Sequence, residues 1–114
     1  ENIIILDSIY DLKTLNIIRS NCKLYIHSHS LCGTAPSLVE AMSLKIPILC
    51  FDVPTNRTTT EEKSLYFHDV KSLTTILKNL SNEKLIKIKN DMYEIAKNRY
   101  TWNRISNLYK KCID

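Results

Sequence analysis

The segment SHSLCGTAPSLVEAM, from Ser28 to Met42, contains the residues best suited to chemistry. It includes Gly33, the only glycine among 114 residues, although a globular chain of this length uses about eight. A retained glycine usually provides a positive φ angle or allows a ligand to approach the backbone closely. Pro36 suits the first position of a helix, because its missing N–H costs nothing there. Glu40 is therefore expected about one turn inside that helix.

The start of this predicted helix is suited to a phosphate group. The unpaired N–H groups of a first helical turn and the helix dipole attract anions, and Gly33 would let the backbone come close to one. A carboxylate such as Glu40 does not bind phosphate, but it accepts hydrogen bonds from paired hydroxyls such as those of a ribose. The pattern predicts a nucleotide, with phosphates at the helix start and the ribose beside Glu40. The alternative is that Gly33 only forms a turn and Glu40 only favours the helix start.

Predicted strands and helices alternate around this segment. Three apolar runs have the length of strands, and their lack of alternation is typical of strands covered on both faces of a parallel sheet. The runs are Ile3–Leu6, Leu24–His27 and Ile46–Val53. Helix-spaced apolar residues lie between them, namely Leu12, Leu15 and Ile18, then Leu38, Ala41 and Met42. The order predicts an α/β fold, a Rossmann-like parallel sheet with a β-α-β-α-β core, in which ligands bind beyond the carboxyl ends of the strands.

The second half of the chain is predicted to add a strand and C-terminal helices. The polar segment PTNRTTTEEK is expected to form a loop, and Leu65–Phe67 is expected to form a short strand. Three helices follow, and the last has an apolar face with Trp102, Ile105, Tyr109 and Cys112. We expect Trp102 and Tyr109 to belong to the core, with a platform for a ligand as the alternative. The predicted N-cap residues are Asp11, Asp69, Ser81 and Thr101.

Composition narrows the classes of function. The net charge is only +4, and the basic residues of the C-terminal part are mixed with acids, which favours a solvated helix face over a surface for nucleic acid or an anionic membrane. The four cysteines have the spacing of neither a zinc site nor a disulfide framework, so reduced thiols are expected. His27 and His29 lie on one side of a strand, but no third ligand accompanies them, so a metal site is a minor alternative. No apolar run reaches the about 18 residues of a membrane span.

A long stretch of the sequence resembles a known enzyme family. The segment HSHSLCGTAPSLVEAMSLKIPILCFDVPTNR is similar to the nucleotide-sugar-binding region of the family-four (group 1) retaining glycosyltransferases. It is closest to a rhamnosyltransferase-like bacterial branch with a GGTNPSLLEAM type of segment. IIILDSIYDLKTLNIIRSNCKLYIH before it, and TTTEEKSLYF and YTWNRISNLY after it, match further landmarks. The resemblance implies the GT-B fold, in which two Rossmann-like domains face a cleft, with residues 1–114 as a single unit in the last part of the C-terminal, donor-binding domain.

The resemblance also implies roles for individual residues. Glu40 matches the second glutamate of the family's E-x7-E motif, which holds the donor ribose, whereas Cys32 stands where the first glutamate is found. Four residues match loop and helix-start positions whose backbone meets the sugar and the diphosphate: Gly33, Thr34, Ala35 and Ser37. Ala35 stands where the close branch commonly has asparagine.

Several further residues near the predicted strand ends also need an interpretation. His29 is expected to reach the donor sugar, with a zinc pair as the alternative, and His27 is expected to be a satisfied core or rim histidine. Tyr10, or its neighbour Ile9, is expected to touch the nucleobase, with structural packing as the competing account. Arg57 either reaches a phosphate or is a surface arginine.

The complete enzyme implied by the resemblance transfers a sugar from a nucleotide diphosphate sugar to a glycan or lipid-linked acceptor, with retention of configuration and without a metal or other cofactor. Because the chain begins at Glu1 inside an apolar run and lacks the family's upstream glycine-rich loop and Arg/Lys pair, we expect it to be an inactive piece of that enzyme. The acceptor domain would lie outside it. A bacterial cytoplasmic location follows, with peripheral attachment to the inner face of the membrane as an option, and no nucleic acid as partner.

Two other classes of function compete with the enzyme. The runner-up is a non-catalytic α/β module that binds a nucleotide or a protein, which the replacement of the first motif glutamate by Cys32 supports. A response-regulator-like domain has the same element order but lacks the acidic cluster after the first strand, where only Asp7 is found. We also expect weak self-association through the last helix, or poor order of that helix, because its family partner domain is absent from the sequence and an exposed apolar patch tends to find a partner.

Overall fold

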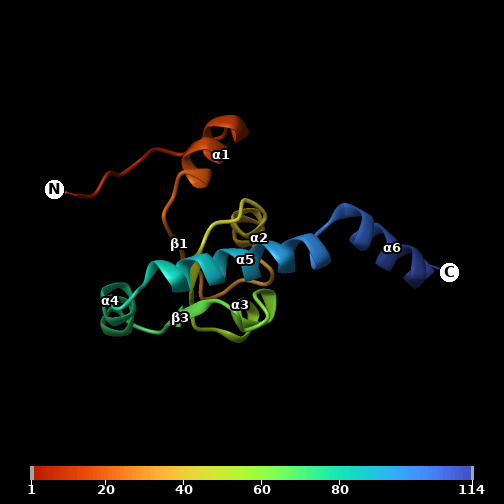
Figure 1. Ribbon diagram of the computed structural model, residues 1–114. Coiled ribbons are helices and arrows are strands. Elements are labelled where there is room, and N and C mark those ends of the chain that lie inside the picture. Colours follow the sequence, from red (N-terminus) through yellow and green to blue (C-terminus); the bar gives the residue numbers. More distant parts are fainter. Residues whose placement is uncertain (1, 114) are drawn as a thin grey trace.

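Three short parallel strands organise the computed structural model, which describes residues 2–113 (Figure 1). They are β1 (Tyr25–His27), β2 (Ile48–Phe51) and β3 (Leu65–Phe67), and they lie in the order β1-β2-β3. Tyr25 pairs with Ile48, and Leu49 pairs with Leu65. The chain is therefore a mixed α/β structure with a small parallel sheet of the Rossmann-like type.

Helices connect and cover these strands. They are α1 (Leu12–Ser20), α2 (Pro36–Ser43), α3 (Pro54–Thr59), α4 (Val70–Lys78), α5 (Asn82–Arg99) and α6 (Trp102–Ile113). The four predicted N-caps are confirmed, because the side chains of Asp11, Asp69, Ser81 and Thr101 each accept a hydrogen bond from the backbone N–H three residues later. Among the described helices, none is long and apolar enough to span a membrane.

The core lies between the sheet and the pair of helices α2 and α5. The predicted inner face of α2, which consists of Leu38, Ala41 and Met42, is fully buried. Met92 of α5 packs into the same cluster. The central strand β2 is buried on both faces, as its continuous apolar run predicts. This core fixes the position of α2, whose first turn holds the candidate site.

The prediction of a strand at Ile3–Leu6 is wrong. Residues 2–11 form no strand, and the segment runs away from the sheet at the N-terminal end of the ribbon (Figure 1). The side chain of Ile5 is 93% exposed. The apolar run has no neighbouring strand to supply hydrogen bonds, and a strand requires that pairing. The β-α-β-α-β core is present, but it begins one element later, at β1.

The predicted loop after Val53 is also partly wrong, because residues 54–59 form the helix α3. Pro54 occupies the first turn, where it is tolerated. The hydroxyls of Thr59 and Thr60 donate to backbone oxygens four residues earlier, at 2.7 Å each. Burial of Asn56, Thr59 and Thr60 outweighs the low helix propensity of this threonine-rich segment.

The expectation that Trp102 and Tyr109 belong to the core is wrong. Trp102 is 86% exposed, and α6 has no buried residue within its described length. The helix extends away from the sheet, beyond the end of α5 (Figure 1). Its apolar side chains are spaced as for a buried helix, but α2 and Tyr100 approach only the first of them, Trp102 and Ile105, and leave none buried.

The core assignment predicts a large difference between two leucines. Leu38 is 0% exposed, whereas Leu31 is 97% exposed. Leu38→Ala should lower the free energy of unfolding by about 2–5 kcal/mol, because it removes buried methyl groups and leaves a cavity. Leu31→Ala should change it by less than about 0.5 kcal/mol. Urea unfolding of both variants measures the difference, and equal effects would contradict the assigned core.

Candidate functional site

The start of α2 lies beyond the carboxyl end of β1, where open parallel sheets bind ligands. Pro36 is the first helical residue, as predicted, and Ala35 is the N-cap, with no side-chain hydrogen bond to the first turn. Residues with a capping oxygen normally occupy that position. No side chain therefore competes with an incoming anion at this helix start.

Asn56 fixes the loop that leads to this helix. Its side-chain nitrogen donates to the backbone oxygen of His29 at 3.1 Å and to that of Phe51 at 2.9 Å. Asn56 is 1% exposed, so its side-chain amide makes both hydrogen bonds from a buried position. One side chain of α3 thus joins the loop after β1 to the end of β2.

Gly33 lies in this loop, and neither its backbone conformation nor its neighbours in the chain require a glycine there. Its φ is not positive, so one of the two reasons expected from the sequence does not apply. A Cβ atom built at Gly33 would have nothing within 4 Å. The remaining reason, a close approach by a ligand, stays a prediction.

The carboxylate of Glu40 has a partner that the sequence does not indicate. Glu40 accepts a hydrogen bond from the guanidinium of Arg19, on α1, and the two form an ion pair. The Arg19 side chain is 15% exposed and that of Glu40 is 51% exposed. α1 has no buried residue, so this pair is a principal side-chain link between α1 and the sheet-bearing part of the chain.

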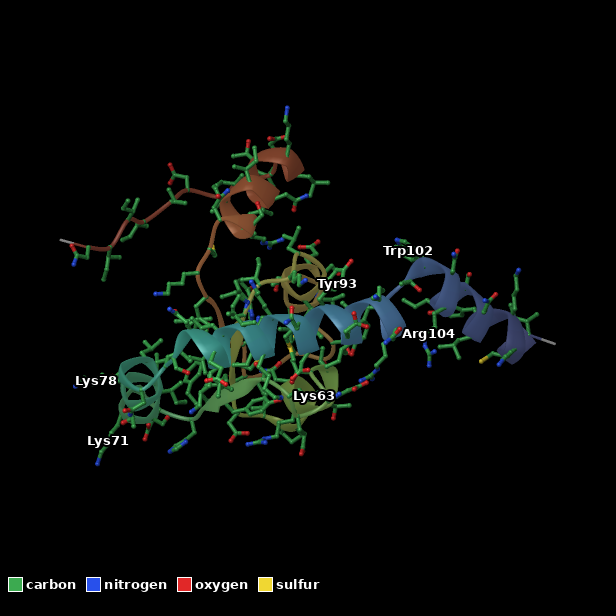
Figure 2. The ribbon with its side chains drawn as sticks, viewed as in Figure 1. Lys63, Lys71, Lys78, Tyr93, Trp102 and Arg104 are labelled. Atoms are coloured by element: carbon green, nitrogen blue, oxygen red, sulfur yellow. The ribbon has the colours of Figure 1, made fainter. Side chains whose placement is uncertain are left out.

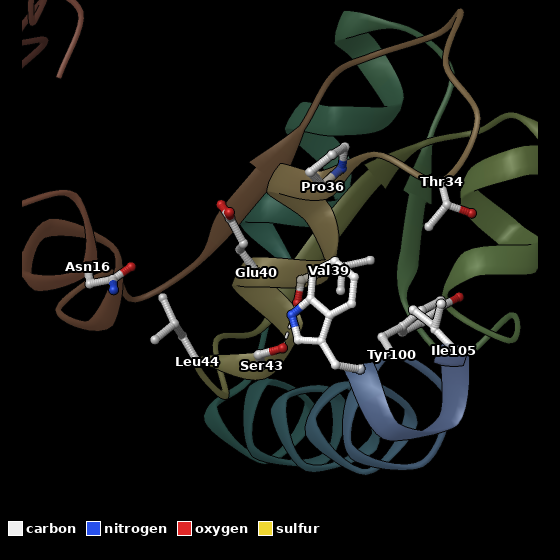
Figure 3. Close-up of a pocket in the computed structure, with 10 residues that line it drawn as sticks. Asn16, Thr34, Pro36, Val39, Glu40, Ser43, Leu44, Tyr100 and Ile105 are labelled. Atoms are coloured by element: carbon white, nitrogen blue, oxygen red, sulfur yellow. Dashed lines mark hydrogen bonds between the residues drawn. The ribbon is translucent and has the colours of Figure 1, made fainter. Parts of the chain in front are cut away.

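Glu40 also lines a groove of about 560 Å³ between α2 and the start of α6 (Figure 3). We call this the α2 groove. Its lining mixes polar residues, Asn16, Thr34, Glu40 and Ser43, with a larger apolar set, Pro36, Val39, Leu44, Tyr100, Trp102 and Ile105. A groove with a mostly apolar lining and a few polar groups is typical of small-molecule sites.

A second hollow of about 300 Å³, the threonine pocket, adjoins the α2 groove. Gly33 and Thr34 line one side, Arg99 lines another, and three threonines of α3 lie between them: Thr55, Thr58 and Thr59. Arg99 donates to the backbone oxygen of Thr58 at 3.0 Å and approaches a carboxylate oxygen of Glu61 at 3.4 Å. Thr34 and Tyr100 line both hollows, so the two meet at the start of α2.

His27 is buried, as expected, but it is not satisfied. Neither ring nitrogen has a hydrogen-bond partner within residues 2–113, and the ring centroid lies 4.8 Å from that of exposed His29. Burial, and secondarily the neighbouring His29, lower the pKa of His27 below its ordinary value. His27 pairs in the sheet with Cys50, whose thiol pKa burial raises to about 11. This Cys–His neighbourhood thus lacks the thiolate that nucleophilic catalysis needs.

Arg57 is not free to bind a phosphate in this structure. Its guanidinium makes two hydrogen bonds to the carboxylate of Asp52, at 2.6 and 2.8 Å, and lies 4.3 Å from the ring centroid of Tyr66. The hydrogen bonds from Arg57 hold the pKa of Asp52 below its usual range. Of the two interpretations of Arg57, its geometry supports a structural role between β2 and α3.

The structure brings some predicted site residues together and separates others. Gly33, Thr34 and Glu40 line the two adjoining hollows, and Ala35 and Ser37 belong to the helix start beside them. Tyr10 lies apart in the N-terminal segment, is 90% exposed and lines neither hollow.

Three residues of this region were missed as site residues. Arg19 and Arg99 come from two other helices, α1 and α5, and Asn56 lies in a segment predicted to be a loop. The one sequence signal for a site residue among these three is a polar residue soon after a buried strand, and it applies to Asn56 alone.

Within residues 2–113, no three histidine, cysteine, aspartate or glutamate side chains gather as metal ligands. Comparisons of the chain with protein-family models, with curated proteins and with solved structures found no match.

His27 predicts how stability depends on pH. Its folded-state pKa is lowered from the ordinary 6.5, so below that pH the unfolded chain binds more protons than the folded chain, and the free energy of unfolding falls as the pH falls. Urea unfolding at about pH 7.5 and about pH 5.5, on either side of the ordinary histidine value, should show this loss. His27→Leu should reduce the pH dependence, and His68→Gln, at an exposed histidine, should leave it. A loss unaffected by His27→Leu would contradict the assignment.

Proposed function

We propose that this chain belongs to the donor-binding part of a retaining glycosyltransferase and binds a nucleotide diphosphate sugar at the start of α2. In the complete enzyme, the bound sugar would pass to a glycan or lipid-linked acceptor with retention of configuration. The sequence resemblance suggests this activity, and the geometry around α2 supports the binding step.

The observation that carries the proposal is the meeting of two chemically different hollows at Thr34. The α2 groove offers the Glu40 carboxylate among apolar side chains, which suits ribose hydroxyls and the less polar part of a nucleoside. The threonine pocket offers the exposed hydroxyls of Thr55 and Thr58 and the guanidinium of Arg99, which suit phosphate oxygens. Arg99 makes a long ion pair with Glu61, at 3.4 Å, through one nitrogen of its guanidinium. A nucleoside diphosphate laid across the start of α2 would meet each surface with the matching part of its structure.

The chemical contribution of such a site is electrostatic. Transfer of the sugar leaves negative charge on the departing diphosphate, and donors already aimed at that charge stabilise it without rearrangement. The first-turn N–H groups of α2 and the side chain of Arg99 are the groups of this chain suited to that role. Gly33, with open space on its Cα, would let the diphosphate approach the loop backbone.

A non-catalytic module remains the second candidate, because one observation favours it. The Glu40 carboxylate is already paired with Arg19, so its role could be to attach α1 rather than to bind a ribose. The two roles differ in what happens when each partner of the ion pair is replaced.

Glu40→Gln and Arg19→Gln distinguish these roles. If Glu40 accepts hydrogen bonds from ribose, Glu40→Gln should weaken the binding of a nucleoside diphosphate at least about tenfold, because a hydrogen bond to a charged group contributes about 1.5–3 kcal/mol. Arg19→Gln removes a competitor for the carboxylate and should leave the affinity equal or higher. Titration calorimetry with the uridine, thymidine and guanosine diphosphates measures both variants.

The opposite pattern would contradict the proposal. If neither variant changes nucleotide affinity, and hydrogen exchange of α1 is accelerated equally in both, Glu40 serves only to attach α1.

A further inference from the structure

We propose that α6 docks on a lipid membrane surface rich in anionic headgroups. The helix has no buried residue within its described length, and it lies away from the sheet (Figure 1). This inference is argued from the residues of α6, of which Trp102 and Ile105 also line the α2 groove.

The first observation is the separation of apolar and basic side chains around α6. Successive helical residues are about 100° apart, so one continuous side collects the large apolar residues Trp102, Ile105, Leu108, Tyr109, Cys112 and Ile113. Arg104 and Lys111 follow one border of this side, and Lys110 lies near the other. Figure 2 shows Trp102 and Arg104 pointing to opposite sides of the helix.

The second observation is that the apolar side has little intramolecular cover. Trp102 and Ile113 are more than four-fifths exposed, and Leu108 and Tyr109 are more than half exposed. Trp102 and Ile105 border the α2 groove at the start of the helix, and the side chains of residues 106–113 beyond them are exposed. A helix with Trp, Tyr and Leu on one side and cations on the other is suited to lie in a membrane interface.

Charge decides between a membrane and a second copy of the chain. α6 contains three cations and no acid, and Asp114 is the next residue in the sequence. Two copies of α6 packed through their apolar sides would bring six cations together, which is unfavourable. One side of a helix about 18 Å long and about 10 Å wide is also far smaller than the about 800 Å² per partner of a stable interface.

An anionic membrane surface avoids both the repulsion among cations and the need for a large protein interface. It attracts each cation near its surface, and the aliphatic stems of arginine and lysine let the charge reach the headgroups while the apolar side is buried. Trp102 and Tyr109 have the amphipathic rings that are enriched at membrane interfaces.

Trp102 is the only tryptophan of the chain, so its fluorescence reports directly on docking. The full chain is mixed with vesicles of phosphatidylcholine, or of phosphatidylcholine with phosphatidylglycerol, and bound protein is measured by sedimentation. We expect sedimentation and a blue shift of Trp102 emission with the anionic vesicles only, and loss of both in high salt. No binding to the anionic vesicles would overturn the proposal.

Matched variants test whether α6 is responsible. Lys110→Gln with Lys111→Gln should weaken binding at least about tenfold, because each cation contributes about a fivefold effect at an anionic surface. Lys71→Gln with Lys78→Gln removes the same charge from exposed positions of α4 (Figure 2) and should have a smaller effect. Equal effects of the two pairs would overturn the proposal, because binding would then follow net charge alone.

The apolar side has its own matched pair. Leu108→Ser should weaken vesicle binding without changing the urea midpoint, because Leu108 is half exposed. Val70→Ser, at an exposed position of α4, should leave vesicle binding unchanged. Concentration-dependent self-association without vesicles, abolished by Leu108→Ser, would show that a second copy covers α6 and would overturn the membrane assignment.

Discussion

Asn56 donates from one buried amide nitrogen to the backbone oxygens of His29 and Phe51. These oxygens lie just after β1 and at the end of β2, which are neighbouring parallel strands. Each hydrogen bond contributes only about 0.5–1.5 kcal/mol net, but leaving its buried partners unsatisfied costs more. The loop after β1 is therefore held at the edge of the sheet where the start of α2 needs it. Both hollows of the candidate site depend on this placement, because Thr34 lies at the end of the same loop.

Around this fixed point, the attachment of the remaining elements becomes progressively weaker. α2 and α5 share a buried cluster with β2, whereas α1 contributes no buried residue and is linked by the Arg19–Glu40 pair. Half-exposed ion pairs stabilise little, so α1 is the element most easily displaced by a ligand that competes for Glu40. α6 has still less cover. The two helices with the least packing are thus α1, which carries the Arg19 partner of Glu40, and α6, which carries the proposed membrane contact.

The sequence predicted the elements that the core requires and failed where an element depends on a missing or distant neighbour. The apolar face of α2, the runs of β1 and β2, and the four N-caps follow from local patterns of spacing and side-chain chemistry. Ile3–Leu6 has the composition of a strand, but composition does not supply a pairing edge. α3 has poor local propensity and forms because Asn56 and Thr60 become buried, which no local pattern encodes.

The candidate site likewise has parts that local sequence patterns predict and parts that they do not. Pro36 and the exposure of Gly33, Thr34 and Glu40 follow from a strand–loop–helix pattern. The partner of Glu40 lies 21 residues earlier, and Arg99 reaches the threonine pocket from the end of another helix. Such contacts depend on how helices pack, so they could not be predicted from spacing.

The central claim, that a nucleoside diphosphate binds at the start of α2, is tested most directly by the amide signal of Gly33. Because Gly33 is the only glycine, its resonance in a nitrogen–proton correlation spectrum is identified without competing glycine signals. Titration with a nucleoside diphosphate should shift the signal of Gly33 together with those of Thr34 and Ser37, and the matching nucleoside without phosphates should shift them less. Unchanged signals at these residues up to saturating ligand, or shifts confined to other elements, would contradict the account.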